Sequence, residues 1–76
     1  MMRYKFTEAG WIVTVEAYEL PALGWPYRLG FQKHDGVSVM DYSTASSLPS
    51  ARAYVTAEAG LMAGVCAALE MVARHV

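Results

Sequence analysis

The sequence predicts an α+β domain in which two β-hairpins form an antiparallel four-stranded sheet and a C-terminal α-helix packs on one face. Apolar and polar residues alternate in four short stretches, near residues 3–8, 11–18, 27–33 and 37–42, and turn residues separate them. Residues 56–76 instead repeat apolar residues at helical spacing. A chain of 76 residues is long enough for only one domain, so residues 1–76 are expected to form a single unit.

The first hairpin is predicted by two alternating stretches on either side of Ala9-Gly10. A loop of two or four residues pairs Phe6 with Val13, whereas a three-residue loop shifts the register by one and buries the wrong side chains. The first choice also pairs Tyr4 with Val15. It places these residues on one face: Tyr4, Phe6, Trp11, Val13, Val15 and Ala17.

Residues 19–26 interrupt the alternation with two prolines and a glycine, which predict a loop without regular structure. The loop is unusually apolar, because it carries two leucines and a tryptophan. One interpretation is a lid over one end of the core. The other is a partner-binding loop, since tryptophan and loops are both frequent at contacts. The second interpretation makes Leu23, Trp25 and Tyr27 protein-binding candidates.

The second hairpin has two possible registers. A three-residue loop with Gly36 left-handed pairs Phe31 with Val39 and collects the apolar side chains on one face. A two-residue Asp-Gly turn is commoner in hairpins, but it pairs Phe31 with Met40 and divides the valines between the faces. The grouping of the apolar residues favours the three-residue loop.

The helical region is expected over residues 48–75. Ser47 or Ser50 can cap a helix that begins near Pro49, and Thr56 can cap a second one. The region is therefore either one long helix or a short piece followed by a long one.

The long helix has two different faces. Large apolar residues fall within an arc of roughly 100° and are expected to face the core: Leu61, Met62, Val65, Leu69, Val72 and Val76. The opposite face is almost uncharged, and its two glycines each cost roughly 1 kcal/mol relative to alanine, which suggests close approach of another backbone. It is either an ordinary alanine-rich surface or a docking face for a second copy or another protein. The docking candidates are Ala59, Gly60, Ala63, Gly64, Ala67 and Met71.

Catalytic chemistry is not indicated. Cys66 has no cation nearby in sequence, and the adjacent His34 and Asp35 fall at a predicted turn with no nucleophile. There is no phosphate-binding glycine loop, no pair of carboxylates at a predicted cleft and no metal-ligand spacing. We therefore expect no enzyme activity, no cofactor and no metal. A lone cysteine is typical of cytoplasmic proteins.

The formal net charge of −1 provides no strong electrostatic argument for a nucleic-acid partner, which is not favoured but stays open. A membrane span is not expected, because Glu58 and Glu70 interrupt the apolar run before about 20 residues.

Residues 10–21, from Gly10-Trp11 to Glu19-Leu20-Pro21, resemble the strand-then-Glu-Leu-Pro segment of HicB-type antitoxins. In that family the glycine lies closer to Glu-Leu-Pro and the helix follows sooner, whereas a whole second hairpin intervenes here. No function is carried over from the resemblance.

Small size, near-neutral charge and the absence of catalytic motifs are typical of non-catalytic protein-binding modules. We expect a small regulator or inhibitor of the phage or mobile-element type, anti-CRISPR-like by size class only, that binds another protein and forms a homodimer. The alternative is a nucleic-acid-binding or antitoxin-like regulator.

Overall fold

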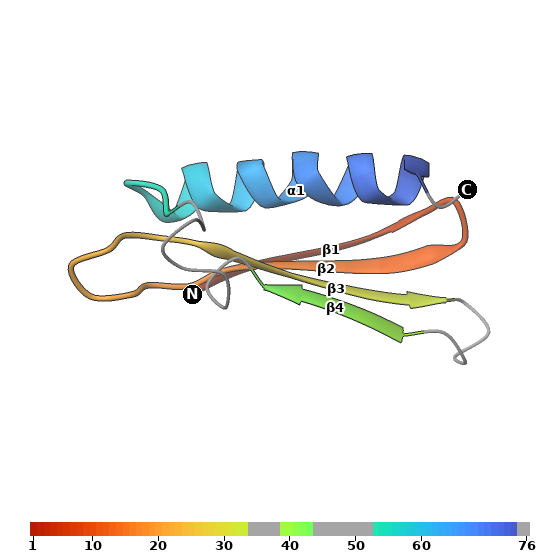
Figure 1. Cartoon of the computed structure of the whole chain (residues 1–76), viewed down its shortest axis with the longest axis horizontal. Coiled ribbons are helices and arrows are strands. Elements are labelled where there is room, and N and C mark those ends of the chain that lie inside the picture. The colour runs from red at the N-terminus through yellow and green to blue at the C-terminus, as the bar shows by residue number, and fades with distance from the viewer. Residues whose placement is uncertain (34–38, 44–52, 75–76) are drawn as a thin grey trace.

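A computed structural model describes residues 1–33, 39–43 and 53–74, the second of these ranges as backbone. The elements in chain order are β1 (Met2–Glu8), β2 (Trp11–Ala17), β3 (Tyr27–Lys33), β4 (Val39–Ser43) and α1 (Ala57–Arg74). Figure 1 shows α1 lying along one face of the sheet, so the molecule has two layers. The α+β class, the antiparallel arrangement of β1, β2 and β3, and the C-terminal helix are confirmed.

The first hairpin has the predicted register. Phe6 pairs with Val13 and Tyr4 pairs with Val15, which leaves Ala9 and Gly10 as a two-residue loop. Both loop residues have positive φ angles, 52° and 84°. A type I′ turn requires this conformation at both positions, and its twist matches that of the flanking strands. A local turn therefore determines which side chains of β1 and β2 face the helix.

β2 is the central strand of the well-buried part of the sheet, because it pairs antiparallel with β1 on one side and β3 on the other. Its odd-numbered side chains are buried and its even-numbered ones are half-buried, as the alternation predicts. The β1 side chains on the same face are less covered: Phe6 is half-buried, and Tyr4 keeps 50% of its surface exposed. The predicted inward face is therefore buried on β2 and only partly covered on the edge strand β1.

β4 lies antiparallel to β3, with Phe31 opposite Met40 and Gln32 opposite Val39. The predicted pairing of Phe31 with Val39 is therefore wrong, and the register is the one expected for a two-residue turn. For this hairpin, the high frequency of two-residue turns predicts the register correctly, whereas the grouping of apolar side chains on one face does not. The predicted left-handed Gly36 lies outside the described residues.

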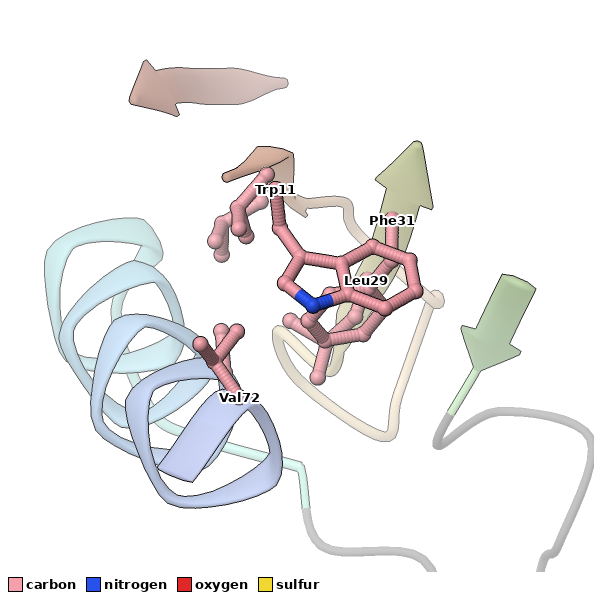
Figure 2. Close-up of a cluster of buried hydrophobic side chains, with 7 residues drawn as sticks. Trp11, Leu29, Phe31 and Val72 are labelled. Carbon is pink, nitrogen blue, oxygen red and sulfur yellow. The ribbon is translucent and has the colours of Figure 1, made fainter. Parts of the chain in front are cut away.

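The core lies between the sheet and α1. Figure 2 shows Val72 of α1 facing Trp11 of β2 and the pair Leu29 and Phe31 of β3. The Trp11 and Phe31 rings meet edge to face, with centroids 6.3 Å apart and an interplanar angle of 88°, which is a favourable aromatic geometry. Lys33 Nζ lies 4.5 Å from the centre of the Trp11 ring and covers that end of the core.

α1 begins after Thr56, whose Oγ1 accepts a hydrogen bond from Ala59 N at 3.1 Å. This is the predicted N-cap, and it satisfies one of the free N–H groups in the first helical turn. Residues 53–56 are not helical, because Tyr54 pairs with Trp25 as an isolated β-bridge. A single helix over 48–75 is therefore wrong, and the earlier part, 48–52, lies outside the described residues.

The face of α1 that contacts the sheet agrees with the prediction only in part. Val72 is buried and Leu61 and Val65 pack against the core as expected, whereas Met62 and Leu69 are exposed, and Val76 lies outside the described residues. Its buried residues follow one row at intervals of four: Gly60, Gly64, Ala68 and Val72. A Cβ on Gly60 would lie 2.6 Å from the Trp25 carbonyl oxygen, and one on Gly64 would lie 2.5 Å from Cγ1 of Val15. The glycines thus allow the helix to approach its own sheet. The contact face is rotated by roughly 90° from the predicted stripe of large residues.

Candidate protein-binding surfaces

The loop between β2 and β3 is held in shape by hydrogen bonds within its own backbone. Leu20 N donates to the Gly24 carbonyl at 2.9 Å, and the amides of Leu23 and Gly24 donate to the Leu20 carbonyl at 3.0 and 3.1 Å. Ala22 and Gly24 have φ angles of 68° and 109°. These left-handed residues reverse the chain within a few positions. The loop therefore has a defined shape and presents Leu23 at its tip.

The loop is also tied to the segment that precedes α1. Trp25 N donates to the Tyr54 carbonyl at 2.7 Å, and Tyr54 N donates to the Trp25 carbonyl at 3.1 Å. A Cβ on Gly24 would come within 2.6 Å of the same Tyr54 carbonyl oxygen, so no larger residue fits there without a shift. Figure 1 shows this loop at the same end of the molecule as the start of α1.

The predicted loop candidates occupy different environments. Leu23 is 56% exposed, whereas Trp25 is half-buried and Pro26 is fully buried. Tyr27 is half-buried and packs against the core, with its Cβ and Cγ close to the backbone of Gly64. Pro26 therefore closes the end of the core, as a lid would, whereas Leu23 projects from it.

Val55 was not among the candidates, although it is 92% exposed. It falls within the helical region expected over residues 48–75, where an exposed valine would be unremarkable. It instead follows Tyr54, whose backbone pairs with the loop. Leu23 and Val55 therefore project from two segments that the Trp25–Tyr54 bridge joins. The sequence does contain a signal: Tyr54 and Val55, two residue types that favour strands, directly precede the capping Thr56. This order indicates an extended backbone just before the helix.

The predicted docking face of α1 is largely covered by the sheet. Gly60 and Gly64 are buried, so the interpretation of these two as a surface for a second copy is wrong. Ala63, Ala67 and Met71 are half-buried, and Ala59 is exposed. At Gly60 and Gly64 the helix approaches the sheet so closely that a larger residue fits only if the backbone shifts, whereas the same row continues with Ala68 and Val72.

A different stripe of α1 is exposed. Met62 and Leu69, both predicted to face the core, keep 64% and 42% of their surfaces exposed. Between and beside them lie three small residues that are also exposed, Ala59, Cys66 and Ala73. We call these five residues the outer seam: Ala59, Met62, Cys66, Leu69 and Ala73. The seam contains no charged residue along the length of the helix.

The sheet face opposite α1 is polar. Arg3 Nε and Nη2 donate to Oε2 of Glu16 at 2.9 and 2.6 Å, and Arg28 lies 5.2 Å from the centre of the Tyr18 ring. A shallow concavity of about 260 Å³ on this face is lined by these polar and apolar side chains: Lys5, Ile12, Thr14, Glu16, Arg28 and Gln32. It offers cations and hydrogen-bonding groups, but also the carboxylate of Glu16.

Comparison of the chain with protein-family models, with curated proteins and with solved structures finds no match. Among the described residues, no three His, Cys, Asp or Glu side chains are grouped where they could hold a metal ion. No described helix combines the length and apolar character that crossing a membrane requires. The surfaces of the molecule are therefore the basis for any proposal about its function.

Proposed function

We propose that this chain is a non-catalytic protein-binding module whose contact site is the loop tip at the start of α1. One observation carries the proposal: a leucine, Leu23, is 56% exposed at the tip of a loop that is held in shape by backbone hydrogen bonds. An exposed large apolar side chain on a defined loop suits insertion into a pocket of another protein. Val55, 92% exposed on the neighbouring segment, extends the apolar surface.

The shape of the loop supports this proposal, because a rigid contact site loses less conformational entropy on binding. Two hydrogen bonds to the Leu20 carbonyl and two between Trp25 and Tyr54 restrict the conformational freedom of the loop backbone. Pro26 is fully buried and anchors the end of the loop beside β3. Leu23 can therefore contact a partner without any reordering of the chain around it.

The class of protein is proposed from its size and surface. A 76-residue chain with a net charge of −1 and one apolar loop tip suits a small regulator or inhibitor that acts by occupying a site on a larger protein. The phage or mobile-element origin and the anti-CRISPR-like type are proposed by analogy of size class alone.

The test compares three forms of the protein as immobilised baits for lysate of the source cells. Leu23→Ser should lose the protein that the wild type captures, or weaken its binding at least about tenfold. Met62→Ser is the matched control, because Met62 is a similarly exposed apolar residue on α1. Both substitutions change exposed positions, so the melting temperature should stay close to that of the wild type. Equal capture by Leu23→Ser and the wild type would refute the loop tip as the contact site.

The concavity on the polar sheet face favours the second candidate, a nucleic-acid-binding or antitoxin-like regulator. Lys5 and Arg28 line it and could contact phosphates, although Arg3 on the same face is paired with Glu16. A salt titration of binding to heparin and to DNA separates the candidates, because phosphate contacts give affinity that falls steeply with salt concentration. Loss of retention in Lys5→Gln and Arg28→Gln would support this function. Retention equal to the wild type would refute it.

A further inference from the structure

The outer edge of β1 carries unpaired backbone groups in the described part of the chain. β1 pairs along its whole length with β2 and, among the described residues, with no other strand. Glu8 and Trp11 close a two-residue turn of type I′, so the backbone groups of Glu8 and of every second residue before it point towards β2. The N–H and C=O groups of the residues between them point away from the sheet, at Arg3, Lys5 and Thr7. Such a row of donors and acceptors is matched along its length only by another extended chain.

The side of this edge that faces α1 is aromatic and only partly covered. Tyr4 is exposed, Phe6 is half-buried, and the centroids of the two rings lie 5.6 Å apart. β1 contains no proline, and its pairing with β2 contains no bulge. The strand therefore presents a long and regular edge, which is the kind that accepts a further strand.

One flank of α1 lies above this edge. In Figure 1, α1 runs from left to right above the sheet, and β1 lies on the far side of β2 from the viewer. A right-handed helix turns by about 100° per residue, so the residue after each buried one points to that far side. This flank consists of Leu61, Val65 and Leu69, of which the first two are half-buried and the third is exposed. A further strand along β1 would bury its inward side chains against this flank and the two β1 rings.

The charges on the other side of the edge favour an acidic occupant. Arg3 and Lys5 lie on the face away from α1. Arg3 is paired with Glu16 at 2.6 Å, whereas Lys5 forms no ion pair within the described part of the chain. A second copy that paired antiparallel along the whole of β1 would place Lys5 opposite Lys5, and like charges directly opposite are destabilising. A carboxylate opposite Lys5 is favourable in the same position. The charge of the edge therefore favours a different, acidic chain over a second copy.

The carboxylates near this edge mark the limits of its apolar side. Glu8 lies at the turn, and Glu58 lies two helical turns before Val65 on the same flank of α1. They border the two ends of the apolar stretch, so acidic side chains of the occupant fit only on the face of Lys5. Glu70 lies about 140° from Val65 around the helix and does not border the edge.

We propose that the outer edge of β1 binds an extended segment of another protein in which apolar and acidic residues alternate. Residues directly opposite on neighbouring strands project to the same face of a sheet. The residues opposite Tyr4 and Phe6 are therefore apolar and lie under α1, and the residue opposite Lys5 is acidic. Backbone hydrogen bonds provide the affinity, and the alternating side chains provide the specificity. The edge and the loop tip are separate surfaces, so this inference does not rest on the proposed function.

Amide hydrogen exchange of the full chain, measured by NMR with a synthetic peptide, tests the proposal. The probe has blocked ends, matches the seven-residue length of β1 and alternates valine with glutamate. The N–H groups of Arg3, Lys5 and Thr7 should exchange rapidly in the free protein, and their exchange should slow about tenfold at a peptide concentration of about ten times Kd. Those of Tyr4 and Phe6 point to β2 and should already exchange slowly in the free protein. A control peptide with lysine in place of each glutamate should bind several-fold more weakly.

Two substitutions of Lys5 separate the backbone contribution from the charge. Lys5→Pro removes the outward N–H and leaves the pairing with β2, because proline is tolerated where the N–H of an edge strand faces solvent, and it should abolish the protection. Lys5→Glu keeps the backbone and should reverse the preference between the two peptides. It gives the decisive comparison if Lys5→Pro does not fold. Arg74→Glu makes the same change in net charge at an exposed position of α1 and should keep the wild-type preference.

Three results would overturn the proposal. The first is that the glutamate peptide protects none of the outward N–H groups in the wild type. The second is that the two peptides bind with equal affinity, because the charge of the edge would then select nothing. The third is slow exchange of Arg3, Lys5 and Thr7 without peptide, which would show that the edge is already paired; a dependence on protein concentration would identify a second copy as the occupant.

Discussion

Replacing Gly60 with alanine distinguishes the two possible orientations of α1 by the sign of its effect. At a solvent-exposed helix position, alanine in place of glycine stabilises by roughly 1 kcal/mol, because it reduces the freedom of the unfolded chain. In the structure the new Cβ would lie 2.6 Å from the Trp25 carbonyl oxygen and 3.4 Å from Cβ of Ala17. The first distance is too short, so the helix or the loop backbone must move.

The expected cost follows from what resists that movement. The Trp25 carbonyl accepts a hydrogen bond from Tyr54 N at 3.1 Å, and Trp25 N donates in return to Tyr54 at 2.7 Å. Overpacking a well-packed contact costs about 1–3 kcal/mol, and weakening one backbone hydrogen bond costs about 1 kcal/mol more. Subtracting the helix-propensity gain of about 1 kcal/mol leaves a net destabilisation of about 2 kcal/mol. In a domain of this size, that lowers the melting temperature by roughly 8–16 °C.

Urea denaturation followed by far-UV circular dichroism measures the effect. Wild type and variants are compared at one low protein concentration, because self-association would add to the apparent stability. Ala59→Gly is the control: Ala59 is exposed on the same helix, so this change should cost only the propensity term of about 1 kcal/mol. If Gly60→Ala raises the denaturation midpoint, the glycine face points to solvent and the orientation of α1 described above is wrong.

Two further predictions concern local structure. Thr56→Ala removes the 3.1 Å hydrogen bond from Ala59 N and should lower the free energy of unfolding by about 1 kcal/mol. Thr56→Ser should keep most of that stability. Equal denaturation midpoints for Thr56→Ala and the wild type would show that the cap contributes nothing. Ala9→Asn should raise the melting temperature, because asparagine tolerates the left-handed φ of 52° better than alanine and Asn-Gly suits a type I′ turn. Ala9→Val should lower it, and the reverse order of these two variants would contradict the turn assignment.

Part of the candidate site could be predicted from the sequence. Composition marked residues 19–26 as an apolar loop, and Leu23 is indeed exposed at its tip. The sequence could not say which apolar side chain of the loop is covered. That depends on the backbone pairing between Trp25 and Tyr54, which lie 29 positions apart and are joined by no local pattern. The same pairing places the exposed Val55 on the segment beside the loop, and for that reason Val55 was not predicted as a site residue.

The sequence by itself determined the features that depend on neighbours along the chain. The alternation in β1 and β2 and the Ala9-Gly10 turn sufficed for the register of the first hairpin, and Thr56 marked the start of α1. The strand register and the helix start follow from the alternation of side chains along a strand or from the backbone conformation of a few adjacent residues.

Only the tertiary structure decided how α1 is rotated about its axis. Apolar residues occur nearly all round this helix, so its pattern alone leaves the buried side open. Large side chains were expected along the whole contact, and Val72 is indeed in the core, yet the line of closest approach to the sheet is occupied by glycines. Gly60 and Gly64 occupy the line of closest approach, and Met62 is left in solvent. That distance is set by packing between segments far apart in the sequence, because the Trp25 carbonyl and the Val15 side chain fill the space where a Cβ would stand.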